Sequence, residues 1–177
     1  MLSYFLFSVP ILFVVGSLFH FVYKWSKNNK LVGVFVPVNE SIFEHSKLLL
    51  FPLTIFYLFS YIFIRDSVEV NSYFFALLIS VVSSIIVMVS FYYTYKEIIG
   101  NSYLWLDIFD LFLSLFVGQS IANHVYVYFR GWEWYVSLFV IVSIFVLYAY
   151  LTFKPFKTPF FKDEKSKTYG INKNIKS

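Results

Sequence analysis

The sequence has no cysteine and few charged residues, and both absences narrow what the protein can be. Without cysteine, disulfide bonds, thiolate metal sites and cysteine nucleophiles are excluded. Only 14% of the 177 residues are charged, whereas soluble domains have about 25%. Hydrophobic residues make up 59% of the chain and aromatic residues 24%. Such a chain cannot cover a surface that faces water, which indicates an integral membrane protein.

The N-terminus lacks the features of a cleaved signal peptide. Residues 1–4 include no positively charged side chain, and no small-residue cleavage site follows the first hydrophobic segment, which is also too long for a signal core. We therefore expect this segment to be retained as a helix.

Five hydrophobic segments are long enough to cross a membrane, which takes about 20 helical residues. They span residues 2–25, 42–64, 73–93, 103–129 and 134–153. A further apolar stretch, residues 31–38, is too short and is interrupted by Gly33 and Pro37, so we expect an interfacial or re-entrant segment there. The predicted fold is an all-α integral membrane bundle of five transmembrane helices over residues 1–153.

Lysines gather in alternate loops, and this pattern predicts an orientation. The loop after the first span carries three lysines, the loop after the third carries Lys96, and a polar tail over residues 154–177 carries seven. The positive-inside rule then places the N-terminus outside and the tail in the cytoplasm, in a bacterial inner membrane. The net charge of +4 reflects this topology, with membrane lipids as partners and no nucleic acid.

Ionisable side chains in or beside the predicted spans meet at the cytoplasmic side. They come from the end of the first span and the starts of the second and fourth. Ionisable groups are costly inside a membrane and mark functional sites. The candidate catalytic residues are His20, Glu40, Glu44, His45, Asp107 and Asp110, and the candidates for supporting a bound cofactor are Asn39, Ser41 and Lys47.

Glu44 also has a purely structural interpretation. The pattern Ser41-x-x-Glu44 fits a capping box, in which the hydroxyl and the carboxylate each accept from a free amide at a helix start. If the helix instead begins at Asn39, then Glu40, Glu44 and Lys47 share one face.

The histidines and aspartates leave alternatives open as well. His20 alone fits a hydrogen bond between helices, but together with His45 and Glu44 it forms a candidate site for a divalent metal such as Zn, Mn or Fe. Asp107 and Asp110 share a helical face, where they can share a proton, bind a cation or form a neutralised structural pair.

Other polar residues are interpreted structurally. Ser80 and Ser84 lie one turn apart and predict close helix packing. The polar residues at the far end of the fourth span, Gln119, Asn123 and His124, are interpreted as groups that meet water outside.

The chain resembles an uncharacterised family of small bacterial multi-pass membrane proteins over nearly its whole length. Three stretches carry the resemblance: His20-Phe21-x-Tyr23-x-Trp25-Ser26, the more specific Phe35-x-Pro37-Val38-Asn39-Glu40-Ser41-x-x-Glu44-His45-x-Lys47-Leu48, and Pro159-x-Phe161 with Tyr169-Gly170-Ile171. The resemblance implies a multi-pass membrane fold and assigns no activity.

Three functions remain open from the sequence. The first is a membrane-embedded enzyme acting on a lipid or lipid-linked substrate, with the histidines as metal ligands. The second is a small proton- or cation-coupled transporter, or the substrate-binding subunit of one. The third is a structural or regulatory subunit, working as a homo-oligomer or with another membrane protein.

Overall fold

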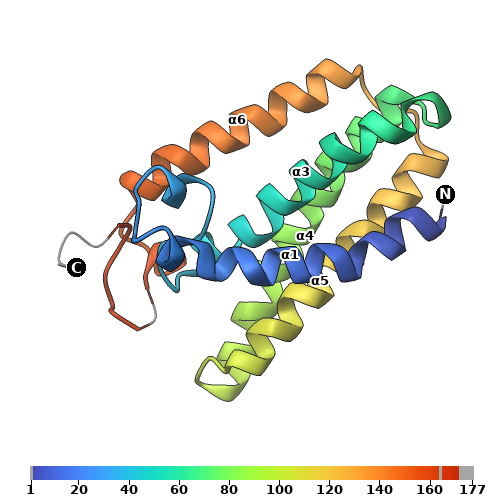
Figure 1. The fold of residues 1–177 in the computed structure, drawn as a ribbon. Coiled ribbons are helices and arrows are strands. Elements are labelled where there is room, and N and C mark those ends of the chain that lie inside the picture. Colours follow the sequence, from blue (N-terminus) through green and yellow to red (C-terminus); the bar gives the residue numbers. More distant parts are fainter. Residues whose placement is uncertain (1, 164, 172–177) are drawn as a thin grey trace.

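The computed structural model describes residues 2–163 and 165–171. Five long helices form a bundle: α1 (Leu2–Trp25), α3 (Lys47–Ile64), α4 (Val70–Ile99), α5 (Leu104–Tyr128) and α6 (Trp134–Phe153). All five are long and apolar enough to cross a membrane, and the described residues form no strand. The predicted all-α membrane fold is confirmed (Figure 1).

Short helical turns lie between some of the long helices and after the last one. They are η1 (Val32–Val34), α2 (Ile42–His45), η2 (Arg65–Ser67) and η3 (Pro159–Phe161). The stretch predicted to be interfacial or re-entrant contains η1, and the second predicted span is divided at Ser46 into α2 and α3. The first and fifth spans have the predicted bounds.

The third span is longer than predicted because both of its ends are capped. Glu69 accepts hydrogen bonds from the amides of Asn71 (3.1 Å) and Ser72 (2.5 Å) and so starts α4 at Val70. Partial burial raises the pKa of Glu69, but these hydrogen bonds outweigh it and the pKa is lowered overall. Gly100, with φ of 84°, ends the helix in the left-handed conformation.

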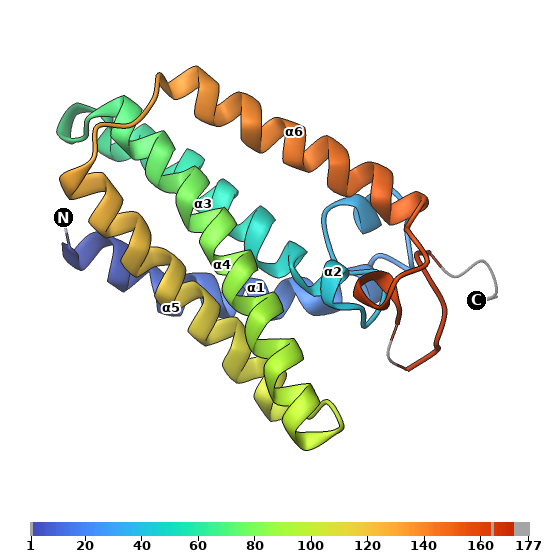
Figure 2. The same ribbon diagram turned by 180° about the vertical axis from the view of Figure 1, so that it is seen from behind.

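The long helices diverge toward one end of the bundle. The N-terminus and the connections α3–α4 and α5–α6 lie at the other end (Figures 1 and 2). At the diverging end, the α4–α5 turn points away from the α1–α3 loop and from the segment after α6. We call this the open end; it comprises residues 25–47, 99–104, 153–163 and 165–171.

The described part of the predicted polar tail folds back onto the bundle. Phe161 in η3 is buried, and its ring centroid lies 4.6 Å from that of Phe43 in α2. The Asn39 side-chain amide donates to the Gly170 carbonyl at 3.0 Å. The last predicted tail residues, 172–177, lie outside the described part of the chain.

Small residues bring the helices close together, as the spacing of Ser80 and Ser84 predicts. A Cβ atom at Gly118 of α5 would lie 1.9 Å from the Ser84 hydroxyl of α4. In the same way, a Cβ at Gly16 of α1 would lie 3.0 Å from the Leu48 carbonyl of α3. Pro52 has no amide to donate to that carbonyl, so α1 approaches α3 where the helix ladder is interrupted.

A polar network joins four helices in the half of the bundle away from the open end. Gln119 of α5 is fully buried at its centre. Its Oε1 accepts from the hydroxyls of Tyr57 (2.8 Å) and Ser80 (3.2 Å), and its Nε2 donates to the Ser8 hydroxyl (2.7 Å). The prediction that Gln119 meets water is therefore wrong, because α1, α3 and α4 surround it. We call these residues the Gln119 network.

Candidate functional site

Two histidines and one glutamate meet at the open end. Glu40, in the loop before α2, lies between His20 of α1 and His45 of α2. One Glu40 carboxylate oxygen is 3.9 Å from His20 Nε2, and the other is 3.6 Å from His45 Nε2. One ligand atom from each residue lies within 4.8 Å of the other two, and each side chain is partly buried. We call this group the triad.

The backbone fixes the orientation of one imidazole. His45 Nδ1 lies 3.0 Å from the Ser41 carbonyl oxygen, which can only accept a hydrogen bond. When the ring is neutral, the proton therefore sits on Nδ1, and the lone pair of Nε2 faces Glu40. A carbonyl held behind a histidine in this way is the usual support for a metal ligand. Ser41, a candidate for supporting a cofactor, contacts the triad through its backbone carbonyl.

Glu40 is the charged centre of the triad. Its side chain is 25% exposed, and its Oε1 also lies 3.1 Å from the Lys165 ammonium. Burial raises the pKa of Glu40, but His45, Lys165 and His20 outweigh it and hold the pKa below the usual range. The carboxyl group is therefore ionised at neutral pH and attracts cations.

Glu44 has a different role from the one proposed for it in a metal site. Its carboxylate accepts hydrogen bonds from the Lys47 ammonium at 2.7 Å and from the Val38 amide at 3.1 Å. Lys47 also donates to the Gly33 carbonyl at 2.8 Å, and both charged side chains are almost fully buried. The pair ties the α1–α3 loop to the α2–α3 junction, and the carboxylate in the triad is Glu40.

Half of the predicted capping box is present at the start of α2. The Ser41 hydroxyl accepts from the Glu44 amide at 3.3 Å. The amide of Ser41 bonds to the Asn39 side chain at 2.9 Å instead of to Glu44. This arrangement starts the helix at Ile42 and leaves Glu40 in the loop, where its side chain reaches both imidazoles.

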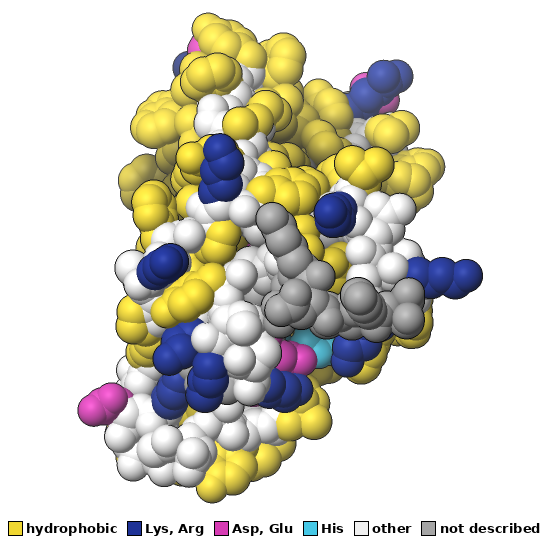
Figure 3. Space-filling model, turned by 90° about the vertical axis from the view of Figure 1, so that its left-hand side faces the viewer, with side chains coloured by type: hydrophobic (Ala, Val, Ile, Leu, Met, Phe, Trp, Pro, Cys, Tyr) yellow, Lys and Arg dark blue, Asp and Glu magenta, His cyan; other side chains and the backbone are white. Residues whose placement is uncertain are grey.

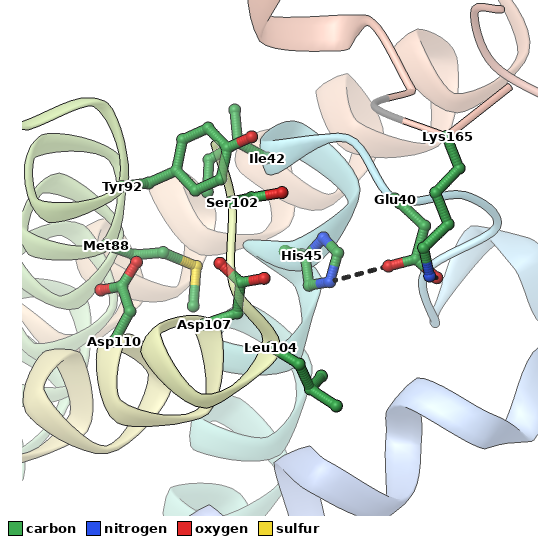
Figure 4. A pocket seen from close by; sticks show the side chains of 10 residues that line it. All are labelled: Glu40, Ile42, His45, Met88, Tyr92, Ser102, Leu104, Asp107, Asp110 and Lys165. Atoms are coloured by element: carbon green, nitrogen blue, oxygen red, sulfur yellow. Dashed lines mark ion pairs between the residues drawn. The ribbon is translucent and has the colours of Figure 1, made fainter. Parts of the chain in front are cut away.

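Asp107 and Asp110 line a polar cavity of about 160 Å³ that reaches the triad. Glu40, His45 and Lys165 line the same cavity (Figure 4). Asp107 is partly buried and accepts a hydrogen bond from the Tyr95 hydroxyl. Asp110 lies deeper, with 2% of its surface exposed, and accepts from the Ser114 hydroxyl at 3.1 Å. Asp107 is thus the more accessible of the two carboxylates.

Several site residues carried no signal in the sequence. Lys165 comes from a segment predicted to be a lysine-rich tail, and nothing in that pattern indicates contact with Glu40. Tyr95 is one of 15 tyrosines in an aromatic chain. His124, the remaining histidine, lies near the end of α5 that is away from the open end, is exposed, and packs against Tyr128.

Sequence comparison places the whole described bundle in one family. The model of a family of unknown function (DUF6512) matches residues 2–171. The chain therefore belongs to this family. No curated protein and no solved structure matches the chain.

Proposed function

We propose that the protein is a membrane-embedded hydrolase that uses a divalent metal ion held by His20, Glu40 and His45. The family is of unknown function, so the proposal depends on the site alone. The observation that carries this proposal is the spacing of the triad. The lone pair of His45 Nε2 and the carboxylate of Glu40 face each other at 3.6 Å. That distance is too long for a hydrogen bond and leaves space for a cation between the imidazole and the carboxylate.

The triad suits zinc or a similar cation. Ligand atoms that bind one tetrahedral zinc ion at about 2.1 Å lie roughly 3.4 Å apart, and two histidines with one glutamate form a known catalytic ligand set. The distances of 3.6 and 3.9 Å need only a small contraction. The Lys165 side chain is 78% exposed, so its ammonium can leave Glu40 when a divalent cation binds.

His20, Glu40 and His45 would hold the ion, which would supply a water molecule of lowered pKa and polarise the bond to be cleaved. Asp107, which lines the cavity beside His45, is positioned to accept the proton as the water oxygen attacks. The same proton then passes to the leaving oxygen, so the reaction consumes one water and regenerates the carboxylate.

A hydrolase fits the bundle better than a carrier does. A carrier needs a polar route from one side to the other. Beyond the triad, the interior is occupied by the Gln119 network, in which Tyr57, Ser8 and Ser80 bond directly to Gln119. The triad is therefore a site at one side, which the lysine pattern predicts to be the cytoplasmic side.

Metal analysis tests the ligand set. The protein should be purified in detergent with an affinity tag that contains no histidine, loaded with Zn²⁺, desalted and analysed by mass spectrometry for bound metal. We expect about one equivalent in the wild type, and at least a tenfold weaker affinity in His20→Ala and His45→Ala. His124→Ala is the matched control and should bind like the wild type. Equal zinc binding by all four proteins would exclude the triad as the metal site.

The hydrolytic step needs a separate test. Extracted membrane lipids should be incubated with the zinc-loaded protein, and new products identified by mass spectrometry. Asp107→Asn should retain zinc and lose at least about a hundredfold in turnover, the lower end of the range for a general base. Full turnover in Asp107→Asn would remove Asp107 from the mechanism, and absence of any product in the wild type would contradict the hydrolase.

A further inference from the structure

Three cavities adjoin one another at the open end, and their linings differ in polarity. An apolar cavity of about 370 Å³ lies between α1 and α5 and shares His45, Met88, Leu104 and Asp107 with the polar cavity. The polar cavity shares Ser102 and Lys165 with a third cavity of about 530 Å³. The polar cavity, which Glu40 and His45 of the triad line, therefore lies between the apolar cavity and the third cavity.

The apolar cavity opens where lipid surrounds the bundle. Phe13, Leu48 and Leu111 line it. Three further lining residues have much of their surface exposed: Phe21 (47%), Leu104 (75%) and Ile108 (48%). Because these three lie in the membrane-spanning helices α1 and α5, or at the first residue of α5, their exposed surface faces hydrocarbon chains. An acyl chain can enter this cavity without crossing water.

The third cavity is basic. Its lining includes Lys96 at the end of α4 and three lysines of the segment after α6, Lys162, Lys165 and Lys167. The side chains of Asn101 and Ser102 add hydrogen-bonding groups. Figure 3 views this face and shows blue lysine and arginine side chains around a histidine and acidic side chains. Four ammonium groups in one cavity favour an anion.

We infer that the substrate is a phospholipid-like anionic amphiphile, with an acyl chain in the apolar cavity and a phosphate among the lysines. This inference rests on the proposed function, because the triad then lies beside the region where chain and headgroup join. The lysine-rich lining favours an anionic headgroup over a neutral one, and the adjoining apolar cavity favours a lipid phosphate over free phosphate. Each lysine near a membrane surface attracts anionic lipid by about 1 kcal/mol.

A binding series tests the inference in detergent solution. The probes are dioctanoyl phosphatidic acid, dioctanoylglycerol and inorganic phosphate, titrated by calorimetry into zinc-loaded protein. We expect phosphatidic acid to bind at least about tenfold more tightly than either of the other two. Equal affinity for dioctanoylglycerol would show that the lysines do not bind the phosphate. Equal affinity for inorganic phosphate would show that the apolar cavity holds no chain.

Variants separate the two halves of the amphiphile. Lys96→Gln/Lys162→Gln/Lys167→Gln should weaken phosphatidic acid binding by about tenfold or more. This triple variant keeps Lys165, which contacts Glu40. Lys30→Gln/Lys157→Gln removes exposed lysines that do not line the basic cavity and should have no effect. Ser17→Leu, which fills the apolar cavity, should weaken the lipid probes and spare phosphate. Unchanged lipid binding in both test variants would overturn the assignment.

Zinc titration and thermal unfolding of the same variants keep the two proposals apart. Zinc binding retained without selective lipid binding contradicts only the amphiphile. Selective lipid binding without zinc binding contradicts only the metal-dependent hydrolase. A variant with a much lower unfolding temperature is replaced by the corresponding single substitutions, for which the same directions are expected.

Discussion

The Gln119 network and the triad both join polar side chains from separate parts of the chain, but their spacing differs. Around Gln119, donors and acceptors lie 2.7 to 3.2 Å apart, and each bond joins a donor to an acceptor. In the triad, the Glu40 oxygens lie 3.6 and 3.9 Å from the two imidazoles. The first group is complete within the protein, and the second leaves room for a cation.

This difference in spacing distinguishes polar groups that stabilise the helix bundle from polar groups that can bind a ligand. A buried polar group stabilises the fold only when its partners are all present. The Gln119 network meets that condition, and the Glu44–Lys47 pair meets it too, although that pair lies at the open end. We therefore expect hydrogen-bond completeness, rather than position in the bundle, to decide which substitutions unfold the protein.

The largest loss of stability is expected for Glu44→Gln. It leaves the Lys47 ammonium buried with its charge unpaired, and breaking such a pair costs about 3–5 kcal/mol. Thermal unfolding in detergent should show a much lower midpoint for this variant. The double variant Glu44→Gln/Lys47→Met should recover most of the loss, because no buried charge remains. A single variant as stable as the wild type would contradict the structural role of the pair.

A smaller loss is expected for Gln119→Ala. The substitution removes three hydrogen bonds and leaves the Tyr57, Ser8 and Ser80 hydroxyls without Gln119, at a cost of about 2–3 kcal/mol. Zinc affinity should stay within twofold of the wild type. Ser120→Ala is the control, since the Ser120 hydroxyl bonds only to its own helix at the Phe116 carbonyl. Loss of zinc binding in Gln119→Ala would show that the Gln119 network and the triad are energetically coupled, and would contradict their separate roles.

The smallest change in stability is expected for Glu40→Gln, although its zinc affinity should fall by at least a hundredfold. Partly exposed ion pairs contribute less than about 1 kcal/mol. The pKa of Glu40 is lowered on folding from 4.5, so its contribution is present above pH 4.5 and is lost as the pH falls through the lowered value. Metal-free wild type and variant should therefore converge in unfolding midpoint in acid. A large difference at neutral pH would make the triad structural.

The helices were predictable from the sequence because each long helix corresponds to a continuous hydrophobic segment. Hydrophobic length alone predicted the bounds of α1 and α6. The third span was predicted too short, because the start of α4 depends on Glu69 capping two amides and its end on Gly100, which hydrophobicity does not record.

The candidate site was predictable only in part. His20, Glu40 and His45 were all named, but the metal site was given Glu44 as its carboxylate. That choice depends on whether α2 begins at Asn39 or Ile42, and the bond from the Ser41 amide to Asn39 decides it. The role of Gln119 depended on which helices cross α5, and Lys165 reaches Glu40 only because η3 packs against Phe43. The contacts of Gln119 and Lys165 are long-range and have no local pattern in the sequence.

The contact between Lys165 and Glu40 also has a consequence for biosynthesis. A ribosome makes residues 20–45, which contain the whole triad, long before it makes the segment that bears Lys165. The triad can therefore assemble in the nascent chain as soon as α1 and α2 meet. Lys165 is made only after the triad residues, so the basic cavity is completed later than the triad, and any metal ion acquired earlier would already be in place.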